Sequence, residues 1–200
     1  MKTQFTASLL LCLVLAGCGG GGEAYVDASP VIAPVQPTVG YLTHPTISGL
    51  EYVNSFTGRE IHLTDATGAY TGYTGNDSVA FVVGDILLFS MPGDLSHPFS
   101  SLYDADRYTN SVLYSDIAVE NVMAFLMVID NDGDYTNGIQ IPDTVRFAAR
   151  GMNINFNQSA WNFRNDPAVQ YAISVLSANT LYGPRTLPSP AQAQYALQSP

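Results

Sequence analysis

Two hydrophobic periodicities divide most of the chain. Between residues 45 and 95, apolar and polar positions alternate with period two, as in Thr46–Tyr52, which is typical of half-buried β-strands. From Asp116 onward, apolar residues recur with helical spacing. The pattern therefore predicts an α+β protein, with a small antiparallel β-sandwich over 45–95 and a helical subdomain over 116–198.

Turn residues punctuate the predicted β part. Asp65–Gly68 is a tight turn, because aspartate can bond its own backbone and glycine accepts positive φ, and Ala69–Tyr73 is the returning strand. A second turn is predicted at Asn76–Asp77. Ser78–Phe89 reads as two buried strands hinged at Gly84–Asp85. Short strands with frequent turns favour a sandwich.

The strongest helical pattern spans Asp116–Ile129, with Asp116 as its N-cap. Apolar residues with helical spacing form one packing face: Val119, Val122, Met123, Leu126 and Ile129. Between the sandwich and this helix, the polar, tyrosine-rich segment 96–115 predicts an irregular linker.

Further helix signals follow an acidic loop at 130–143. Asp143 is predicted to cap a short helix over Thr144–Arg150, and Met152–Asn157 to be a strand or an extended link. The pair Asp166–Pro167 predicts a helix start, with Val169, Ala172, Ile173 and Leu176 on its buried face. Ser189–Pro190 predicts a final helix through Leu197.

The chain begins with a targeting signal. Lys2 provides a positive charge, and the apolar run Leu9–Leu15 is too short to span a bilayer. The sequence Leu15-Ala16-Gly17-Cys18 resembles the lipobox of bacterial lipoproteins. The resemblance implies that residues 1–17 are a removed signal peptide and that Cys18 is acylated. The alternative is an ordinary signal peptide with a chance cysteine.

Glycine follows the cysteine where aspartate would resemble an inner-membrane retention signal, and this implies an outer-membrane lipid anchor at Cys18. Residues 18–44 are rich in glycine and proline. They predict a disordered, lipidated tether that holds the folded part off the membrane. The alternative is that Tyr25–Val35 lies along the domain as an edge strand.

Composition limits the class of function. Charged residues make up 12% of the chain, and the formal net charge is −10. Nucleic-acid binding needs a basic footprint on the phosphate backbone, so nucleic acid is excluded as a partner. After removal of the signal, Cys18 is the one remaining cysteine, which excludes an internal disulfide.

Several sequence motifs resemble one family of secreted proteins and lipoproteins from Gram-negative bacteria. They are ISGLEY, TDATGAY, GNDSVAFVVGDILL and FLMVIDNDGDYTNGIQI, similar to the family's SGxxY, TDxxGxFxY, GDxxL and LDxDGxxxNGIxI. The TD-x-x-G turn resembles transthyretin-like and carboxypeptidase-regulatory sandwiches. The resemblance covers Thr46–Leu197 and implies a β-module followed by a helix and loop. Met91–Leu95 departs from the family's link, and no activity is implied.

The acidic loop is the main concentration of candidate chemistry. Its aspartates are spaced as the first, third and fifth positions of a calcium-binding loop. The candidate calcium ligands are Asp130, Asp132, Asp134, Thr136 and Asn137. A preceding helix C-terminus also favours a cation. Tyr135 and Ile141 replace the glycine and the bidentate glutamate of an EF-hand. An Asx-rich turn without metal therefore stays open as the alternative.

No catalytic constellation is found, so no catalytic residue is assigned. The sequence has no G-x-S-x-G elbow, P-loop or dinucleotide fingerprint. Three histidines lack zinc spacing: His44, His62 and His97. Asp85 and Asp94 could be paired carboxylates of a glycosidase, but turn positions fit them better.

Two groups of aromatic residues have competing interpretations. For Trp161, Phe163 and Tyr171, packing of the C-terminal helices is favoured over a sugar-stacking surface. An exposed recognition surface is favoured for four tyrosines: Tyr103, Tyr108, Tyr114 and Tyr135.

Together these patterns favour a non-enzymatic outer-membrane lipoprotein. It would act as a surface or periplasmic interaction module for a protein or glycan, with a structural calcium as an added hypothesis. One alternative is a carbohydrate-active or other hydrolytic envelope enzyme that uses aspartates. A second alternative is an accessory factor of an envelope assembly.

Overall fold

The computed structural model describes residues 35–73, 78–92 and 116–198. All of them fall within one compact unit, Pro34–Pro200. Several predicted features lie outside the described residues: the signal peptide, the lipidation site at Cys18, most of the tether, the turn at Asn76–Asp77 and the linker 96–115.

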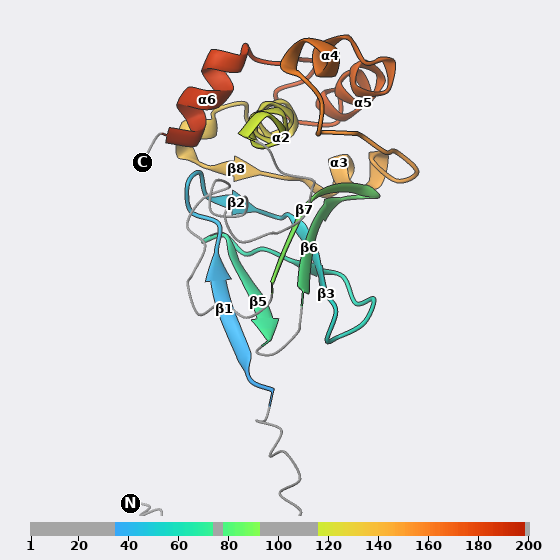
Figure 1. Ribbon diagram of the computed structural model, residues 1–200. Helices are drawn as coiled ribbons and strands as arrows, with labels where there is room; N and C mark the ends of the chain where they lie inside the picture. The colour runs from blue at the N-terminus through green and yellow to red at the C-terminus, as the bar shows by residue number, and fades with distance from the viewer. Residues whose placement is uncertain (1–34, 74–77, 93–115, 199–200) are drawn as a thin grey trace, which may run out of the picture. The chain divides into compact units, whose positions relative to one another are not determined.

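Two antiparallel sheets make up the β layer (Figure 1). The smaller sheet pairs β1 (Pro37–Tyr41) with β5 (Ala69–Tyr73). The larger sheet has the order β4-β3-β6-β7. Its strands are β3 (Glu51–Asn54), β4 (His62–Leu63), β6 (Ser78–Val83) and β7 (Ile86–Pro92).

Aromatic rings pack the two sheets together. The ring centroid of Tyr70, on β5, lies 4.9 Å from that of Phe81, on β6, in an edge-to-face arrangement. Phe81 in turn stacks on Phe89 of β7, with 4.7 Å between centroids. Such pairs contribute about 0.5–1.5 kcal/mol beyond the area they bury. The sandwich-like contact of the β layer therefore rests on these rings.

The predicted strand Thr46–Tyr52 is interrupted at Gly49 and gives β2 (Ile47–Ser48) and β3. Gly49 has a φ of +69°, and a Cβ there would lie 2.5 Å from the Ile141 carbonyl oxygen. Glycine lets the chain turn, so that β2 leaves the sheet and pairs in parallel with β8 (Ile139–Gln140). The α+β class is confirmed, but this parallel pair was not predicted.

The predicted tether 18–44 extends too far toward the domain, because β1 lies inside that range. Pro37 occupies the first residue of β1, where proline is tolerated in a strand. Val39 and Tyr41 then pair with Thr71 and Ala69 of β5. Because this segment is rich in proline, the sequence pattern did not predict the strand at the end of the tether.

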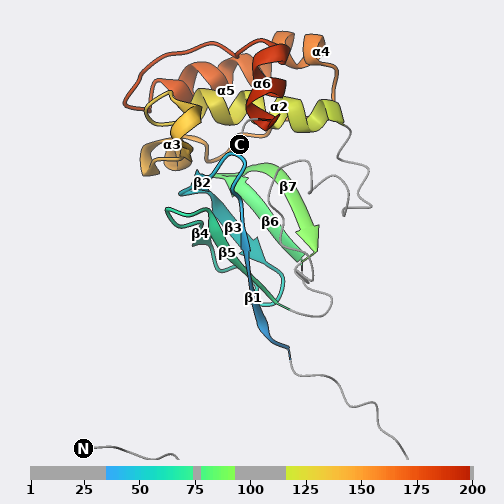
Figure 2. The ribbon, with the colours of Figure 1, turned by 90° about the vertical axis from the view of Figure 1, so that its left-hand side faces the viewer.

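Five α-helices of the described chain gather at one end of the β layer, as Figures 1 and 2 show. They are α2 (Asp116–Ile129), α3 (Asp143–Ala148), α4 (Ala160–Asn165), α5 (Pro167–Ser177) and α6 (Pro190–Gln198). A short 3-10 helix, η1 (Tyr135–Asn137), lies between α2 and α3.

Helix α2 is the centre of the helical layer. It contacts α4, α5 and α6, and its predicted packing face is buried as expected. Other positions around the helix are buried too: Ala118, Ala124, Phe125 and Val128. The prediction of one packing face was incomplete, because one hydrophobic core runs from the sheets through α2 to the other helices.

The predictions for the remaining helices were partly correct. Asp166 caps α5 as predicted, since its Oδ1 accepts a hydrogen bond from the Ala168 N–H (2.8 Å). The cap predicted at Asp143 is wrong, because Pro142 occupies the N-cap and Asp143 lies in the first turn. Helix α4 was not predicted, and Met152–Asn157 forms no strand.

Two arginines, Arg146 in α3 and Arg150 just after it, connect the helical layer to the β layer. Arg146 Nη1 donates to the carbonyl oxygens of Gly49 (2.7 Å) and Ile141 (2.5 Å). Arg150 Nη2 donates to Glu51 Oε1 (2.5 Å) on β3. Glu51 is buried, so a charged pair helps to fix the helical layer on the sheet.

Candidate binding site at the acidic loop

The acidic loop joins α2 to α3 and includes η1 and β8. Backbone hydrogen bonds fix its second half to the β layer. The Ile139 N–H donates to the Thr46 carbonyl (2.7 Å), and the Ile141 N–H donates to the Ser48 carbonyl (3.0 Å). The first half is held by α2, so the loop has a defined position between the two layers.

Asp130 is fully buried at the end of α2. Its Oδ1 accepts a hydrogen bond from the Gln140 N–H (2.9 Å), while Oδ2 has no partner among the described residues. Burial raises the pKa of Asp130 to about 6; the nearby Asp132 carboxylate adds to this rise, and the Gln140 N–H opposes it. Relative to the unfolded chain, the folded protein therefore holds the proton of this carboxyl group up to a higher pH.

The two other aspartates of the loop are exposed and bond to the loop itself. Asp132 accepts from Asn137 Nδ2 (2.9 Å) and from the Asp134 N–H (2.9 Å), and these bonds lower its pKa. Asp134 Oδ1 accepts from the Thr136 N–H (3.1 Å) and hydroxyl (2.5 Å). This is the hydrogen-bond pattern of Asx turns.

The five candidate calcium ligands lie on one short segment of the sequence, and hydrogen bonds connect four of them: Asp132, Asp134, Thr136 and Asn137. In the described part of the chain, no three His, Cys, Asp or Glu side chains form a group that could hold a metal ion. The calcium site stays a prediction, and the turn alternative accounts for the observed hydrogen bonds.

Arg185 supplies a positive charge at the C-terminus of α2. Its Nη1 donates to the Met127 carbonyl (3.2 Å) and its Nη2 to the Asp130 carbonyl, so it satisfies carbonyls that a helix end leaves free. Its charge also lowers the pKa of Asp130. Part of the cationic charge expected near this helix end therefore comes from the chain.

The segment that carries Arg185 docks closely on the acidic loop. The Tyr182 N–H donates to the Asn131 carbonyl (3.0 Å), and the Arg185 guanidinium lies 4.9 Å from the Tyr182 ring centroid. Gly133 has a φ of +78°, and a Cβ there would lie 2.8 Å from both Tyr182 Cδ2 and Arg185 Nη1. Glycine is needed at this contact.

A groove of about 590 Å³ runs between the loop, the docked segment and α6. Its apolar walls include Tyr135, Tyr182, Pro184 and Pro188, and Gln192 provides an amide. No carboxylate lines it. Aromatic rings with scattered polar groups are typical of recognition surfaces, so the groove suits binding better than hydrolysis.

Aromatic predictions were only partly correct. Phe163 is buried, as the packing interpretation expected, but Trp161 and Tyr171 are 73% and 63% exposed. They lie on faces of α4 and α5 that no described element covers. Tyr135, expected on an exposed recognition surface, is partly buried against the core and lines the groove. The other three tyrosines lie outside the described residues.

Two further polar candidates, His62 and Asp85, have structural partners. His62 stacks on Tyr52, with 5.3 Å between ring centroids. Asp85 accepts from the Gly151 N–H (2.7 Å) and pairs with Arg150 (3.4 Å), which agrees with a turn position rather than a catalytic one. Asp94 and His97 lie outside the described residues.

Sequence reasoning did not single out Arg185 or Tyr182. One signal was present: basic residues number 7 in the chain, and an arginine just after a Gly-Pro pair is a candidate to cap a neighbouring helix. Which helix it caps depends on contacts between distant segments, and periodicity does not encode them.

Comparisons with protein-family models, with curated proteins and with solved structures return no match. The fold and the site therefore define the class: an α+β domain with a solvent-accessible aromatic groove beside a self-bonded acidic loop. Within the described ranges, none of the helices has the length and apolar character needed to cross a membrane.

Proposed function

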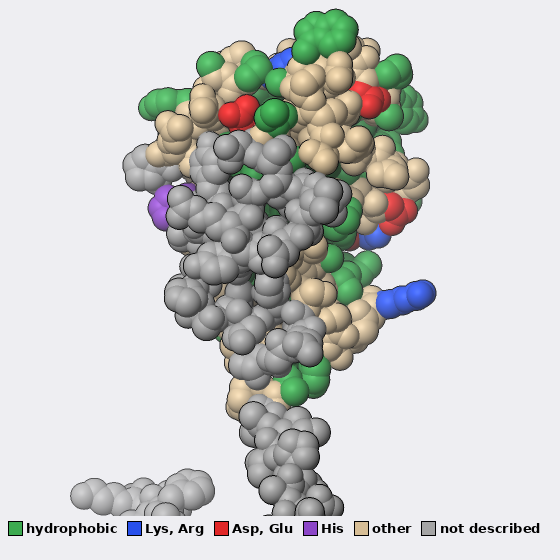
Figure 3. All heavy atoms as spheres, viewed as in Figure 1, with side chains coloured by type: hydrophobic (Ala, Val, Ile, Leu, Met, Phe, Trp, Pro, Cys, Tyr) green, Lys and Arg blue, Asp and Glu red, His purple; other side chains and the backbone are tan. Residues whose placement is uncertain are grey.

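We propose that the protein is an outer-membrane lipoprotein, anchored through Cys18, that acts as a non-enzymatic interaction module. The supporting observation is that the most exposed large apolar side chains of the described residues all belong to the helical layer, where Figure 3 shows several separate hydrophobic groups. Each is at least 63% exposed: Phe147, Trp161, Tyr171, Leu181, Tyr182 and Tyr195. Five of these six side chains are aromatic, and aromatic residues are enriched at the cores of protein interfaces.

Part of this surface borders the acidic loop. Leu181 and Tyr182 belong to the segment docked on the loop, and the Thr144 hydroxyl of α3 donates to the Asn179 carbonyl (2.6 Å) of the same segment. Phe147 follows on α3. Aliphatic and aromatic side chains together favour a protein partner, whereas a glycan would mainly use flat rings and amides.

The hydrolytic alternative has less support. A hydrolase that uses two carboxylates needs both of them at an accessible cleft. Asp130 is inaccessible to solvent, and Asp132 and Asp134 bond to their own loop. The accessory-factor alternative differs only in the identity of the partner, so capture of the partner tests it as well.

Affinity capture of the full-length lipidated protein from its own envelope tests the proposal. We expect a partner protein with the wild type and a severalfold loss with Leu181→Ser combined with Phe147→Ser. The matched control Ile61→Ser changes an exposed apolar side chain of the β layer and should retain the partner. Cys18→Ser should move the protein out of the membrane fraction.

Recovery that is unaffected by the double variant, or hydrolytic activity abolished by replacing one aspartate, would contradict the proposal. Binding to purified envelope glycans in place of a protein would assign the surface to the glycan alternative.

The calcium hypothesis is tested separately. We expect millimolar calcium to raise the melting temperature, because a divalent ion would neutralise the carboxylates of the loop. Asp132→Ala should remove that shift, and Glu60→Gln, an exposed change in the β layer, should leave it intact. A melting temperature that does not respond to calcium would favour the Asx turn without metal.

A further inference from the structure

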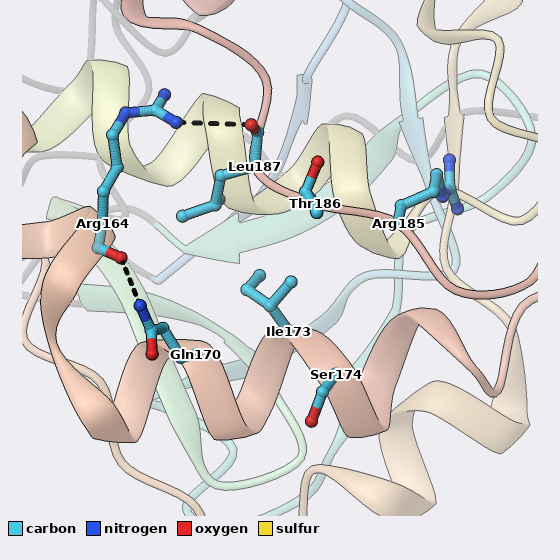
Figure 4. Close-up of a pocket in the computed structure, with 7 residues that line it drawn as sticks. All are labelled: Arg164, Gln170, Ile173, Ser174, Arg185, Thr186 and Leu187. Carbon is cyan, nitrogen blue, oxygen red and sulfur yellow. Dashed lines mark hydrogen bonds between the residues drawn. The ribbon is translucent and has the colours of Figure 1, made fainter.

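A second hollow lies on the helical layer, between α5 and residues 185–187 (Figure 4). Its volume is about 360 Å³, within the range typical of small-molecule sites. Ile173 from α5 and Leu187 from the opposite segment point into it and form apolar walls. Gln170, Ser174 and Thr186 add amide and hydroxyl groups at its edge.

Two arginines border this hollow, Arg164 and Arg185. Arg164 Nη1 donates to the Leu187 carbonyl (3.3 Å), and its Nη2 donates to the Pro188 carbonyl. These bonds use two of the five N–H donors of a guanidinium, and Nε has no partner among the described residues. Burial lowers the pKa of Arg164.

Two other arginines of the described chain form ion pairs with carboxylates. Arg146 pairs with Asp143, and Arg150 pairs with Glu51 and Asp85. Neither Arg164 nor Arg185 has a carboxylate within ion-pair distance in the described chain. Arg164 therefore places a positive charge without an ion-pair partner at the edge of the hollow, whereas the charge of Arg185 also acts on the nearby Asp130 and Asp132 carboxylates.

We propose that the hollow between α5 and residues 185–187 binds a small organic carboxylate with an apolar body. The carboxylate would lie against Arg164, because a planar guanidinium matches a carboxylate in geometry and charge. The apolar body would lie between Ile173 and Leu187. The absence of a lining acid disfavours a cation, and the apolar walls disfavour a small inorganic anion.

The proposed ligand of the hollow differs from the protein partner proposed for the exposed surface. The hollow and the groove do share two bordering residues, Arg185 and Thr186. Binding of a carboxylate does not depend on the interaction function. The two proposals can therefore fail independently.

Calorimetric titration of the full-length protein with hexanoate tests the site, with hexanol and acetate as matched probes. We expect hexanoate to bind at least tenfold more tightly than hexanol, which lacks the charge, and than acetate, which lacks the apolar body. Arg164→Gln should weaken hexanoate binding at least tenfold. Arg59→Gln, an exposed arginine of the β layer, should leave it unchanged.

Ser174→Phe gives a second variant, since Ser174 lines the hollow from the exposed side of α5 and a phenyl ring there would narrow the opening. It should also weaken hexanoate binding. A leucine-ended tetrapeptide with a free or an amidated C-terminus distinguishes a polypeptide end from a free acid as the source of the carboxylate. Equal binding of hexanoate and hexanol, or hexanoate binding that survives both variants, would overturn the proposal.

Discussion

Replacing Arg150 with methionine is expected to lower the free energy of unfolding by about 2–4 kcal/mol. The change would leave the buried Glu51 carboxylate with the Gly84 N–H (2.6 Å) as a donor but without its counter-ion, and an unpaired buried charge is costly. The upper end is discounted because the Arg150 side chain is 42% exposed. Urea denaturation monitored by circular dichroism measures the difference.

A second variant separates the charge from the packing. Glu51→Gln combined with Arg150→Met should recover more than half of the loss, because a neutral amide does not need a counter-ion. Arg59→Met removes an exposed arginine of the β layer and should change stability by less than about 0.5 kcal/mol. A double variant no more stable than Arg150→Met would show that packing, not the charge, causes the loss.

Asp130→Asn is expected to stabilise the protein at neutral pH in the absence of divalent cations. The folded pKa of Asp130 is about 6, above its ordinary value of 3.8. The folded state therefore holds a proton that the unfolded chain releases between these values, and wild-type stability falls as pH rises through that window. The full shift corresponds to about 3 kcal/mol. As pH rises from 4 to 8, we expect the free energy of unfolding of the variant to increase by about 2–3 kcal/mol relative to that of the wild type.

Measuring the difference between the two proteins removes the contributions of other carboxylates, since those are common to both. Asparagine keeps an acceptor for the Gln140 N–H, so the backbone contact is preserved. Glu60→Gln serves as the matched control and should show no such pH-dependent gain. A constant difference across the pH range would refute the buried-proton explanation. If calcium binds, the sign reverses in its presence, because the variant loses a ligand.

Local chemistry in the sequence predicted several elements with good accuracy. The strand Ala69–Tyr73, the helical face Val119–Ile129 and the cap at Asp166 agree with the structure, because each depends on residues within one or two turns of chain. Asp116, expected as the N-cap of α2, is instead its first helical residue. The same reasoning found the acidic loop as a concentration of polar groups. It could not show that Asp130 is buried while Asp132 and Asp134 are exposed.

Features that depend on distant segments were missed. The ion pair of Glu51 with Arg150, the cap on α2 by Arg185 and the exposure of Trp161 all follow from how the layers meet. Hydrophobic periodicity shows that a side chain is apolar, but not whether another element covers it. The positive charge expected near the acidic loop is a further example. Part of it comes from Arg185, which lies 55 positions after Asp130, and local sequence patterns do not reveal that contact.

The parallel pair of β2 and β8 has a consequence for how the chain acquires its structure. Ser48 and Ile139 meet although 91 positions separate them, and closing so long a loop costs conformational entropy before any contact repays it. A chain that emerges from its N-terminus first cannot complete this contact until residue 140 is available. The contact that joins β2 to the loop before α3 therefore forms late during synthesis, after the strands β3 to β7 have already emerged.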